Sequence, residues 1–264
     1  MIHRLKSVRE SAVGFVAVLL IACICGPSAD AVLIHRYSFN DGTAKDSVGK
    51  IDGQLKGAAS IADGKLVLKN EDKTSDDAQL SYLEFAGPIL PKSGSVTIMA
   101  WFTTTDAGNY ARILNFGDKD GAEGQAFIYF TPRNADDLSR VGISATDAAS
   151  KTYQDNDRLD DGKPHMVALV IDGTAKKLHV FIDGKEPKPA EDLGDNTLDK
   201  VRQVNNWLGR SSFDGDAGVT GSIDEFRVYD NPLTADEVAA VFKAGPDSTE
   251  APATAPTTGP AATK

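Results

Sequence analysis

Short runs of alternating apolar and polar residues, each closed by a turn segment, constrain the fold of this chain more than any other feature of its 264 residues. The runs are rich in Val, Ile, Phe, Tyr and Thr, and Gly, Asp, Asn or Pro separate them, as in β-strands joined by loops. The predicted strands are Leu33–Phe39, Lys65–Leu68, Leu80–Phe85, Ser95–Thr104, Ala111–Gly117, Gln125–Thr131, Arg140–Thr146, His165–Asp172, Lys176–Asp183, Asn206–Gly209 and Gly221–Tyr229. No helical period precedes residue 233, so we predict an all-β fold, an antiparallel two-sheet jelly-roll sandwich.

The run Ser95–Thr104 carries apolar residues on both of its faces. One face holds Val96, Ile98, Ala100 and Phe102, and the other holds Thr97, Met99 and Trp101. Side chains alternate between the two faces of a strand. The run therefore predicts a strand that packs against a second sheet on one face and lines a cleft on the other.

Two turns and one short C-terminal helix are marked by specific residues. Asp172-Gly173 and Asp183-Gly184 each separate two strand-like runs, which predicts two-residue type I′ hairpins. Thr234 and Glu237 have the spacing of a capping box and a glycine follows the run, so we predict a helix over Ala235–Lys243.

The first 31 residues resemble an export signal. Three basic residues precede an apolar run, residues 12–25, that is too short to span a membrane, and Ala29-Asp30-Ala31 is a small-x-small cleavage motif. We therefore predict a signal peptide over residues 1–31 and a secreted, periplasmic or cell-surface domain. A second interpretation stays open: Leu20–Cys23 fits a bacterial lipobox, in which an acylated Cys23 would anchor the chain to a membrane.

Both cysteines lie in this leader, so the predicted domain, residues 32–245, has no disulfide. Residues 246–264 are rich in Pro, Ala and Thr and lack large apolar side chains, which predicts a disordered tail. The chain has 38 acidic against 28 basic residues, a net charge of −10. This excess argues against a nucleic-acid partner, because phosphate contacts need clustered Lys and Arg.

Four segments in order along the chain carry a family resemblance. They are Arg36-Tyr37-Ser38-Phe39-Asn40-Asp41-Gly42, Ser95-Val96-Thr97-Ile98-Met99-Ala100-Trp101-Phe102, Leu178-His179-Val180-Phe181-Ile182-Asp183-Gly184, and Gly221-Ser222-Ile223-Asp224-Glu225-Phe226-Arg227-Val228-Tyr229-Asp230. The last, with the helix after it, strongly resembles the closing strand and helix of laminin-G-like jelly-roll domains in the concanavalin A-like lectin/glucanase superfamily. The resemblance implies an antiparallel sandwich with one concave face that binds glycans or proteins, mostly without catalysis. It also implies a structural calcium ion between the first loop and the closing strand.

The sequence favours a non-catalytic protein. Glycoside hydrolysis needs two carboxylates flanking one bond, and the Glu-x-Asp-x-x-Glu pattern of the superfamily's laminarinase-like hydrolases is absent. Glu84 has no second acid in register, and the adjacent Asp224 and Glu225 are expected on opposite faces of their strand. A glycoside hydrolase therefore ranks last among the hypotheses.

Three acids are candidates for the calcium site. Calcium prefers carboxylate and carbonyl oxygens, and Asp41 and Asp46 of the first loop would approach Asp224 if the first and last strands pair, as the resemblance implies. An alternative stays open in which Asp41 is a turn residue and Asp224 accepts a backbone hydrogen bond.

Aromatic residues in or beside loops are the candidate ligand contacts, because sugar rings stack on flat side chains. We select Trp207, Tyr110, Tyr153 and Phe213, and interpret Trp101 as a core residue. The histidines stand alone on separate strands, which favours packing or a hydrogen bond.

The sequence thus predicts an exported, non-catalytic binding module whose partner is a glycan or cell-surface glycoconjugate. The alternative is a surface-displayed structural or protein-interaction domain. Contact with a membrane is expected only through Cys23.

Overall fold

The computed structural model describes residues 31–105, 107–118, 126–145, 150–155 and 157–249. Residues 1–30 of the predicted signal peptide, with Cys23, and the tail from residue 250 lie outside the described residues, so their interpretation stays a prediction. Within the described ranges, no helix is long and apolar enough to cross a membrane.

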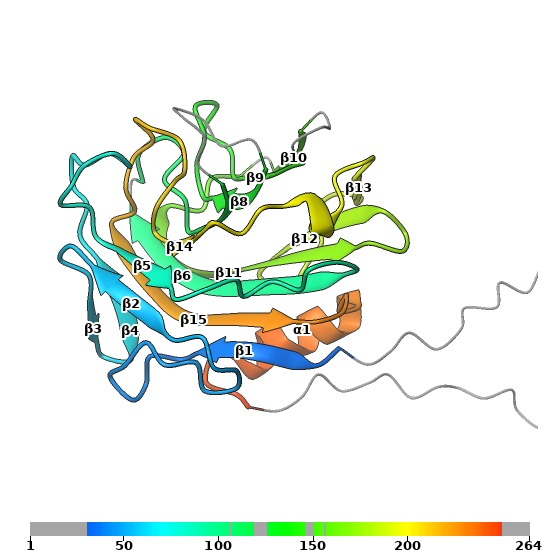
Figure 1. Cartoon of the computed structure of the whole chain (residues 1–264), viewed down its shortest axis with the longest axis horizontal. Coiled ribbons are helices and arrows are strands. Elements are labelled where there is room, and N and C mark those ends of the chain that lie inside the picture. Colours follow the sequence, from blue (N-terminus) through cyan, green and yellow to red (C-terminus); the bar gives the residue numbers. More distant parts are fainter. Residues whose placement is uncertain (1–30, 106, 119–125, 146–149, 156, 250–264) are drawn as a thin grey trace, which may run out of the picture.

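The strands form two antiparallel sheets that lie face to face (Figure 1). Sheet A has the order β13-β12-β11-β6-β15-β4-β3, with β1 also paired to β15, and sheet B has the order β10-β9-β8-β7-β14-β5-β2. The strands of sheet A are β1 (Leu33–Tyr37), β3 (Ser60–Ala62), β4 (Lys65–Leu68), β6 (Val96–Thr105), β11 (Asp161–Asp172), β12 (Lys177–Ile182), β13 (Glu191–Asp192) and β15 (Gly221–Tyr229). Those of sheet B are β2 (Gly53–Lys56), β5 (Tyr82–Phe85), β7 (Leu114–Gly117), β8 (Phe127–Thr131), β9 (Arg140–Ser144), β10 (Lys151–Gln154) and β14 (Asn205–Leu208). The predicted all-β, two-sheet architecture is confirmed.

The main core fills the space between the two sheets. Strand β6 contributes its predicted face to this core, and every side chain of that face is buried: Val96, Ile98, Ala100 and Phe102. Opposite them, β7 and β8 of sheet B supply Phe116, Ile128 and Phe130. Close packing of these apolar side chains is what joins the sheets, since the strands of one sheet make no ladder with the other.

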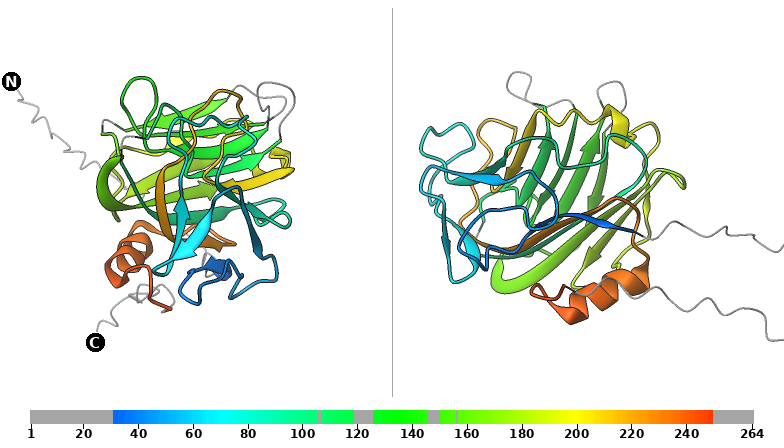
Figure 2. Two further views of the ribbon diagram at one scale, coloured as in Figure 1. Left: turned by 90° about the vertical axis from the view of Figure 1, so that its left-hand side faces the viewer. Right: turned by 60° about the horizontal axis from the view of Figure 1, so that its bottom comes forward.

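The second face of β6 does not line a cleft, and this part of the prediction was wrong. The helix α1 (Ala235–Ala244) lies across the outer side of sheet A (Figure 2). Its Val238 and Val241 form a second apolar cluster with Met99, Trp101 and Phe181. A strand that is apolar on both faces is equally expected when a helix covers its second face. Trp101 is buried in this cluster, as the sequence interpretation had it.

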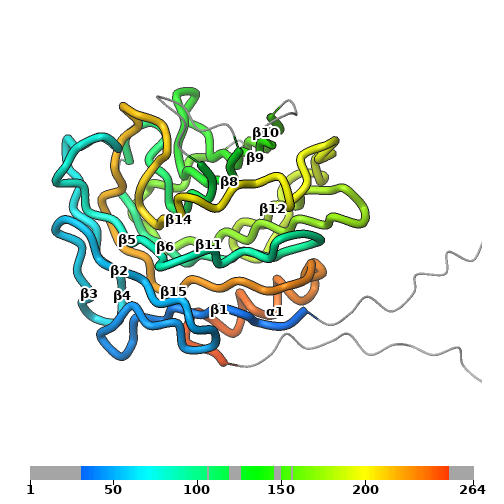
Figure 3. Tube along the Cα trace, in the orientation of Figure 1, coloured from blue at the N-terminus to red at the C-terminus, as the bar shows by residue number. Residues whose placement is uncertain are grey.

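The predicted capping box is confirmed and explains where α1 begins. The Thr234 hydroxyl accepts from the backbone N–H of Glu237, and the Glu237 carboxylate accepts from the backbone N–H of Thr234 at 2.7 Å. These two bonds satisfy donors that the first turn of a helix leaves without intrahelical partners. Gly245, with φ of 86°, ends the helix. Figure 3 shows the first strand β1 alongside β15, with which it pairs.

Only one of the two predicted hairpin turns is right. Asp183 and Gly184 both have positive φ and join Ile182 to Lys185 through reciprocal backbone hydrogen bonds, as in a type I′ turn. The turn after Asp172 instead spans residues 173–176, and its positive φ falls on Lys176. The Asp172 carboxylate accepts from the backbone N–H groups of Thr174 and Ala175, which holds this longer connection.

A buried charge cluster joins the first strand, the closing strand and the C-terminal segment. Glu225 of β15 is fully buried and accepts from Arg36 Nε at 2.6 Å and Arg227 Nε at 2.7 Å. Arg227 also donates to the carbonyl oxygens of Pro246 and Ser248, at 2.6 and 2.7 Å. One carboxylate therefore compensates two guanidinium groups that are away from water.

We expect Glu225→Ala to lower the free energy of unfolding by about 3–5 kcal/mol, because it leaves two buried cations without their counter-ion. Urea denaturation monitored by tryptophan fluorescence measures the change. The matched control is Asp224→Ala, one residue earlier on β15, where the carboxylate contacts Lys65 at 2.9 Å in a partly exposed pair. That substitution should cost less than about 1 kcal/mol. Equal losses in the two variants would contradict the assignment.

Candidate functional site

The outer face of sheet B carries a row of polar and aromatic side chains. Strand pairing places Glu84, Trp207, Asn115 and Tyr129 directly opposite one another on β5, β14, β7 and β8. Their neighbours along each strand, such as Leu83, point into the core. The alternation of strand side chains thus collects these four residues on one surface.

Strand β9 supplies a glycine where this row continues. Gly142 lies opposite Tyr129, and a β-carbon at position 142 would overlap the Tyr129 ring. The missing side chain lets that ring lie flat over the neighbouring strand. A glycine in the middle of a strand is otherwise unfavourable, so its presence here is explained by the position of the aromatic ring.

Arg112, just before β7, lies between two aromatic rings. Its guanidinium carbon is 3.8 Å from the centre of the Tyr129 ring and 4.3 Å from that of Phe213. Arg112 is fully buried. Burial lowers its pKa to about 10, and the nearby Asp216 carboxylate, 3.3 Å away, counteracts that shift. Stacking on two rings and this carboxylate offset the loss of hydration.

Asp216 and a small amide–hydroxyl network hold Arg112 in place. Asp216 accepts from Ser211 Oγ at 2.6 Å, and burial raises its pKa despite the opposing effects of Arg112 and Ser211. Asn115 accepts from Arg112 Nη1 and donates to Ser212 Oγ at 2.7 Å. The loop after β14 is thereby fixed against β7, and it carries Phe213 to its position over the guanidinium group.

A second arginine, Arg210, covers the other end of the row. Its guanidinium carbon is 4.5 Å from the centre of the Trp207 ring and 4.7 Å from that of Tyr82. The Trp207 indole N–H donates to Glu84, whose carboxylate also forms an ion pair with Lys56 at 2.9 Å. The Lys56 ammonium lowers the pKa of Glu84, so this acid is ionised at neutral pH.

A third arginine, Arg140, opens strand β9 on the same face. Its guanidinium carbon is 6.0 Å from the centre of the Tyr110 ring. Arg140 lies opposite Thr131 of β8. Burial raises the pKa of the Tyr129 phenol, and the positive charges of Arg112 and Arg140 oppose that shift. Three guanidinium groups and five aromatic rings therefore meet at one end of sheet B.

The structure brings three of the four predicted ligand residues to this face. Trp207 is only 5% exposed, so it supports Arg210 and offers little free surface. Tyr110 and Phe213 are half-buried. Tyr153 is a correction: it is 2% exposed and belongs to the core between the sheets. The strand that carries Tyr153, β10, was not among the predicted strands, so alternation could not assign Tyr153 to the inner or the outer face of the sheet.

Sequence reasoning missed the arginines and two of the tyrosines, Tyr82 and Tyr129. Tyr129 lies in a predicted strand, Gln125–Thr131, and the alternation with Ile128 and Phe130 already places it on the outer face. Its ring therefore carried a usable signal. The arginines carried no such signal, because an arginine beside a strand is usually a solvated surface residue.

The three predicted calcium ligands are engaged separately. Asp41 accepts from the backbone and hydroxyl of Thr43, and Asp224 is the extra residue of a β-bulge and contacts Lys65. Within the described ranges, no group of three or more His, Cys, Asp or Glu side chains is arranged to hold a metal ion. The described residues therefore give the calcium prediction no support, and chelation tests it.

Asp46 in particular does not fit a cation site. Its carboxylate accepts from the backbone N–H groups of Arg36 and Gly49 at 3.1 and 2.8 Å, and it contacts His35 Nδ1 at 2.6 Å. Burial raises its pKa, but the hydrogen bonds from His35, Gly49, Arg36 and Ile51 outweigh that effect and lower it. A carboxylate surrounded by donors is already compensated, and it closes the first loop onto β1.

We expect Asp46→Asn to destabilise the protein at pH 7 by about 2 kcal/mol, because several buried N–H donors lose a charged acceptor. Since the folded-state pKa is lowered, the stabilisation is present above the unfolded pKa of about 4 and disappears as pH falls through the lower folded value. Urea denaturation at pH 7 and pH 3 measures the difference, which should shrink at pH 3. The exposed Asp41→Asn is the control.

Chelation gives the complementary measurement. With these carboxylates already partnered, we expect the melting temperature to stay unchanged when EDTA is added. A lower melting temperature with EDTA that calcium restores would contradict this expectation and support the calcium prediction.

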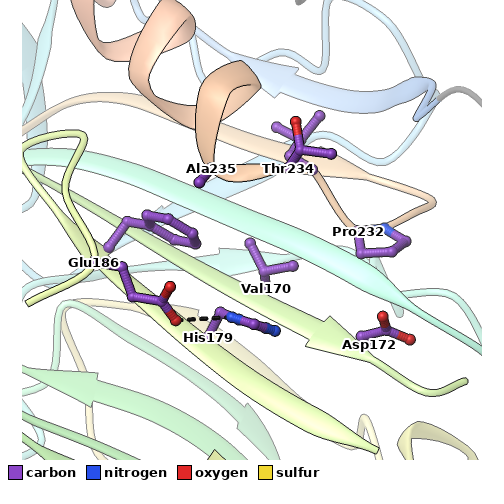
Figure 4. A pocket seen from close by; sticks show the side chains of 9 residues that line it. Val170, Asp172, His179, Glu186, Pro232, Thr234 and Ala235 are labelled. Carbon is purple, nitrogen blue, oxygen red and sulfur yellow. Dashed lines mark hydrogen bonds and ion pairs between the residues drawn. The ribbon is translucent and has the colours of Figure 1, made fainter. Parts of the chain in front are cut away.

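A cavity of about 270 Å³ lies on the other side of the molecule, between β12 and the start of α1 (Figure 4). His179 and Glu186 face each other at its rim at 2.7 Å, and Val170 and Phe181 line its floor. Its polar groups already have hydrogen-bond partners, because Asp172 accepts from its own turn and Thr234 caps the helix. This cavity therefore offers an incoming ligand fewer free polar groups than the arginine-rich face of sheet B.

Comparison with known proteins identifies the fold family. Residues 77–239, more than half of the chain, match the family model described as the concanavalin A-like lectin/glucanases superfamily. Comparison with curated protein sequences gave no match.

Three solved structures share the fold at low sequence identity. Domain 4 of AbnA, a GH43 extracellular arabinanase from Geobacillus stearothermophilus in complex with arabinotriose, is 21% identical with a TM-score of 0.59, covering 80% of this chain and 98% of that domain. The Ruminococcus gnavus IT-sialidase CBM40 bound to alpha2,3 sialyllactose is 21% identical with a TM-score of 0.50, covering 57% and 83%. The receptor binding domain of the botulinum neurotoxin C/D mosaic serotype is 12% identical with a TM-score of 0.59. That match covers 81% of this chain and 51% of the toxin domain, so the chain spans about half of its length.

Together with the family match, the fold and its closing strand place the chain in the concanavalin A-like lectin/glucanase superfamily.

Proposed function

We propose that this chain is an exported, non-catalytic module that binds a glycan through the outer face of sheet B. The observation that carries the proposal is the meeting of Tyr82, Tyr110 and Phe213, all half-buried, with the half-buried Arg140 and Arg210 on one surface. Flat rings supply apolar contact for sugar C–H faces, and guanidinium groups supply hydrogen-bond donors for hydroxyl groups. Two proteins of related fold support the proposal, because the AbnA domain is in complex with arabinotriose and the CBM40 is bound to sialyllactose.

The acids of this face support a non-catalytic role. Glu84 is neutralised by Lys56, and Asp216 is held by Arg112 and Ser211. Each carboxylate therefore stabilises neighbouring side chains of the site. A glycosidase would need a pair of them free to reach one glycosidic bond.

The alternative, a protein-interaction domain, rests on one observation. The receptor-binding domains of botulinum neurotoxins share the fold, and one of them is described in complex with rat synaptotagmin II. The aromatic and arginine content of the sheet-B face suits a protein partner as well, because Tyr, Trp and Arg are enriched where proteins bind one another. Retention of a protein without any glycan would favour this alternative.

Glycan binding is tested by affinity electrophoresis through gels that contain single polysaccharides, with release of reducing sugar measured in parallel. We expect Tyr82→Ala and Phe213→Ala to weaken retention five- to tenfold, which corresponds to about 1 kcal/mol of lost ring contact. Phe242→Ala is the matched control, because Phe242 is 39% exposed on α1 and lies on the other sheet.

Equal retention of all three variants would contradict the assignment of the face. Sugar release that depends on a carboxylate would contradict the non-catalytic role. Mass spectrometry of the exported chain tests the leader, with an N-terminus at Val32 expected and an acylated Cys23 as the other outcome.

A further inference from the structure

Eight arginines lie in the described part of the chain, and six of them contact a carboxylate. The six pairs are Arg36–Glu225, Arg227–Glu225, Arg112–Asp216, Arg133–Asp137, Arg158–Asp160 and Arg202–Asp118. Arg140 and Arg210 differ, because the guanidinium group of neither one contacts a carboxylate of the described residues. Both of them lie on the outer face of sheet B.

The two guanidinium groups also lack hydrogen bonds to any described residue. The Nε atoms of Arg140 and Arg210 are buried and have no partner, and the Nε of the fully buried Arg112 between them is likewise unpaired. The chain has an excess of acids, so carboxylates were available to pair with them. Neighbouring side chains enclose these Nε atoms, so an acceptor from outside can reach only the Nη ends of the half-buried Arg140 and Arg210. Those Nη groups are donors that the described residues leave unused.

Aromatic rings hold these donors in defined planes. The Arg210 guanidinium lies over Trp207 and Tyr82, and Arg140 lies near the Tyr110 ring. Stacking fixes the plane of a guanidinium group and leaves its N–H edge free. That edge matches the two oxygens of a carboxylate in a bidentate pair, which is stronger and more directional than a bond to a neutral hydroxyl group.

We propose that the sheet-B face binds an acidic glycan and that Arg140 and Arg210 pair with carboxylates of its sugar units. This inference rests on the glycan-binding function proposed above. Arg140 opens β9 and Arg210 follows β14, with β7 and β8 between them. Three strand spacings separate their strands by about 15 Å. The ligand is therefore an oligosaccharide that presents carboxylates at two places, and Tyr82, Tyr110 and Phe213 contact its ring faces.

Isothermal titration of the purified protein tests this with matched acidic and neutral probes. One pair is a galacturonic acid pentasaccharide and its full methyl ester, and the second pair is sialyllactose and lactose, so the two arms distinguish a uronic from a sialic carboxylate. We expect the acidic member of at least one pair to bind at least tenfold more tightly than its neutral partner, because only the carboxylate forms the bidentate pair. Higher salt should weaken that binding.

Substitutions locate the contact. Arg140→Gln and Arg210→Gln should each reduce affinity for the acidic probe about tenfold while the melting temperature stays close to that of the parent, since neither guanidinium group forms a hydrogen bond or a contact ion pair with the described residues. Lys243→Gln, an exposed residue of α1 on the other sheet, removes the same charge and should leave binding unchanged. Arg210→Lys should restore only part of the affinity, because an ammonium group cannot form the bidentate pair.

The outcomes separate this inference from the function on which it rests. Tight binding of a neutral glycan with no preference for acid would overturn the inference and leave glycan binding in place. Binding of sulfated dextran as tight as that of the pentasaccharide would overturn the carboxylate assignment. Unchanged affinity in both arginine variants would overturn the site, and no binding of any glycan would overturn the proposed function as well.

Discussion

The pairing of the closing strand β15 is the constraint on which the rest of the structure depends. β15 pairs along one edge with β6 and along the other with β4 and then β1, so residues from both ends of the chain share one sheet. Its Phe226 and Val228 reach the main core, and Tyr229 reaches the cluster beneath α1. Glu225 then fixes Arg36 and Arg227 between these layers. Pairing with β15 positions the first strand, and the outer face of β15 helps to seat the helix. The inner face of β15 contributes to the core on which sheet B packs.

The two sheets bury charge in different ways. On sheet A, Glu225 satisfies two arginines at once, so the buried groups are compensated within the chain. On sheet B, Arg112 has Asp216 and two rings, whereas Arg140 and Arg210 contact rings and form no ion pair with a described carboxylate. Stacking relieves part of the cost of removing a cation from water and leaves the N–H donors unused. The same residue type is therefore structural in one sheet and free to meet a ligand in the other.

Strand alternation made much of the fold predictable, and its limits explain the errors. β4 and β15 have the predicted bounds because they combine clear alternation with flanking Gly or Asp residues. The missed strands β2, β3, β10 and β13 have at most four residues and at most one fully buried position each, so they carry little periodic signal. Tyr153 was misassigned for that reason. The candidate site was harder, because Arg112, Arg140 and Arg210 meet only after β7, β9 and β14 are brought together by pairing across residues distant in sequence.

The net negative charge of the chain restricts which anionic ligands the arginine-rich face can bind. A net charge of −10 repels a long polyanion at a distance, and screening at physiological salt confines favourable contacts to within about 8 Å of the arginines. An acidic ligand therefore gains little from general attraction and depends on carboxylates placed against two fixed guanidinium planes. Such recognition favours a short oligosaccharide or the end of a chain over a uniformly charged polymer. The acid excess and the unpaired arginines are then complementary: the first suppresses non-specific anion binding, and the second gives a defined anion a place to bind.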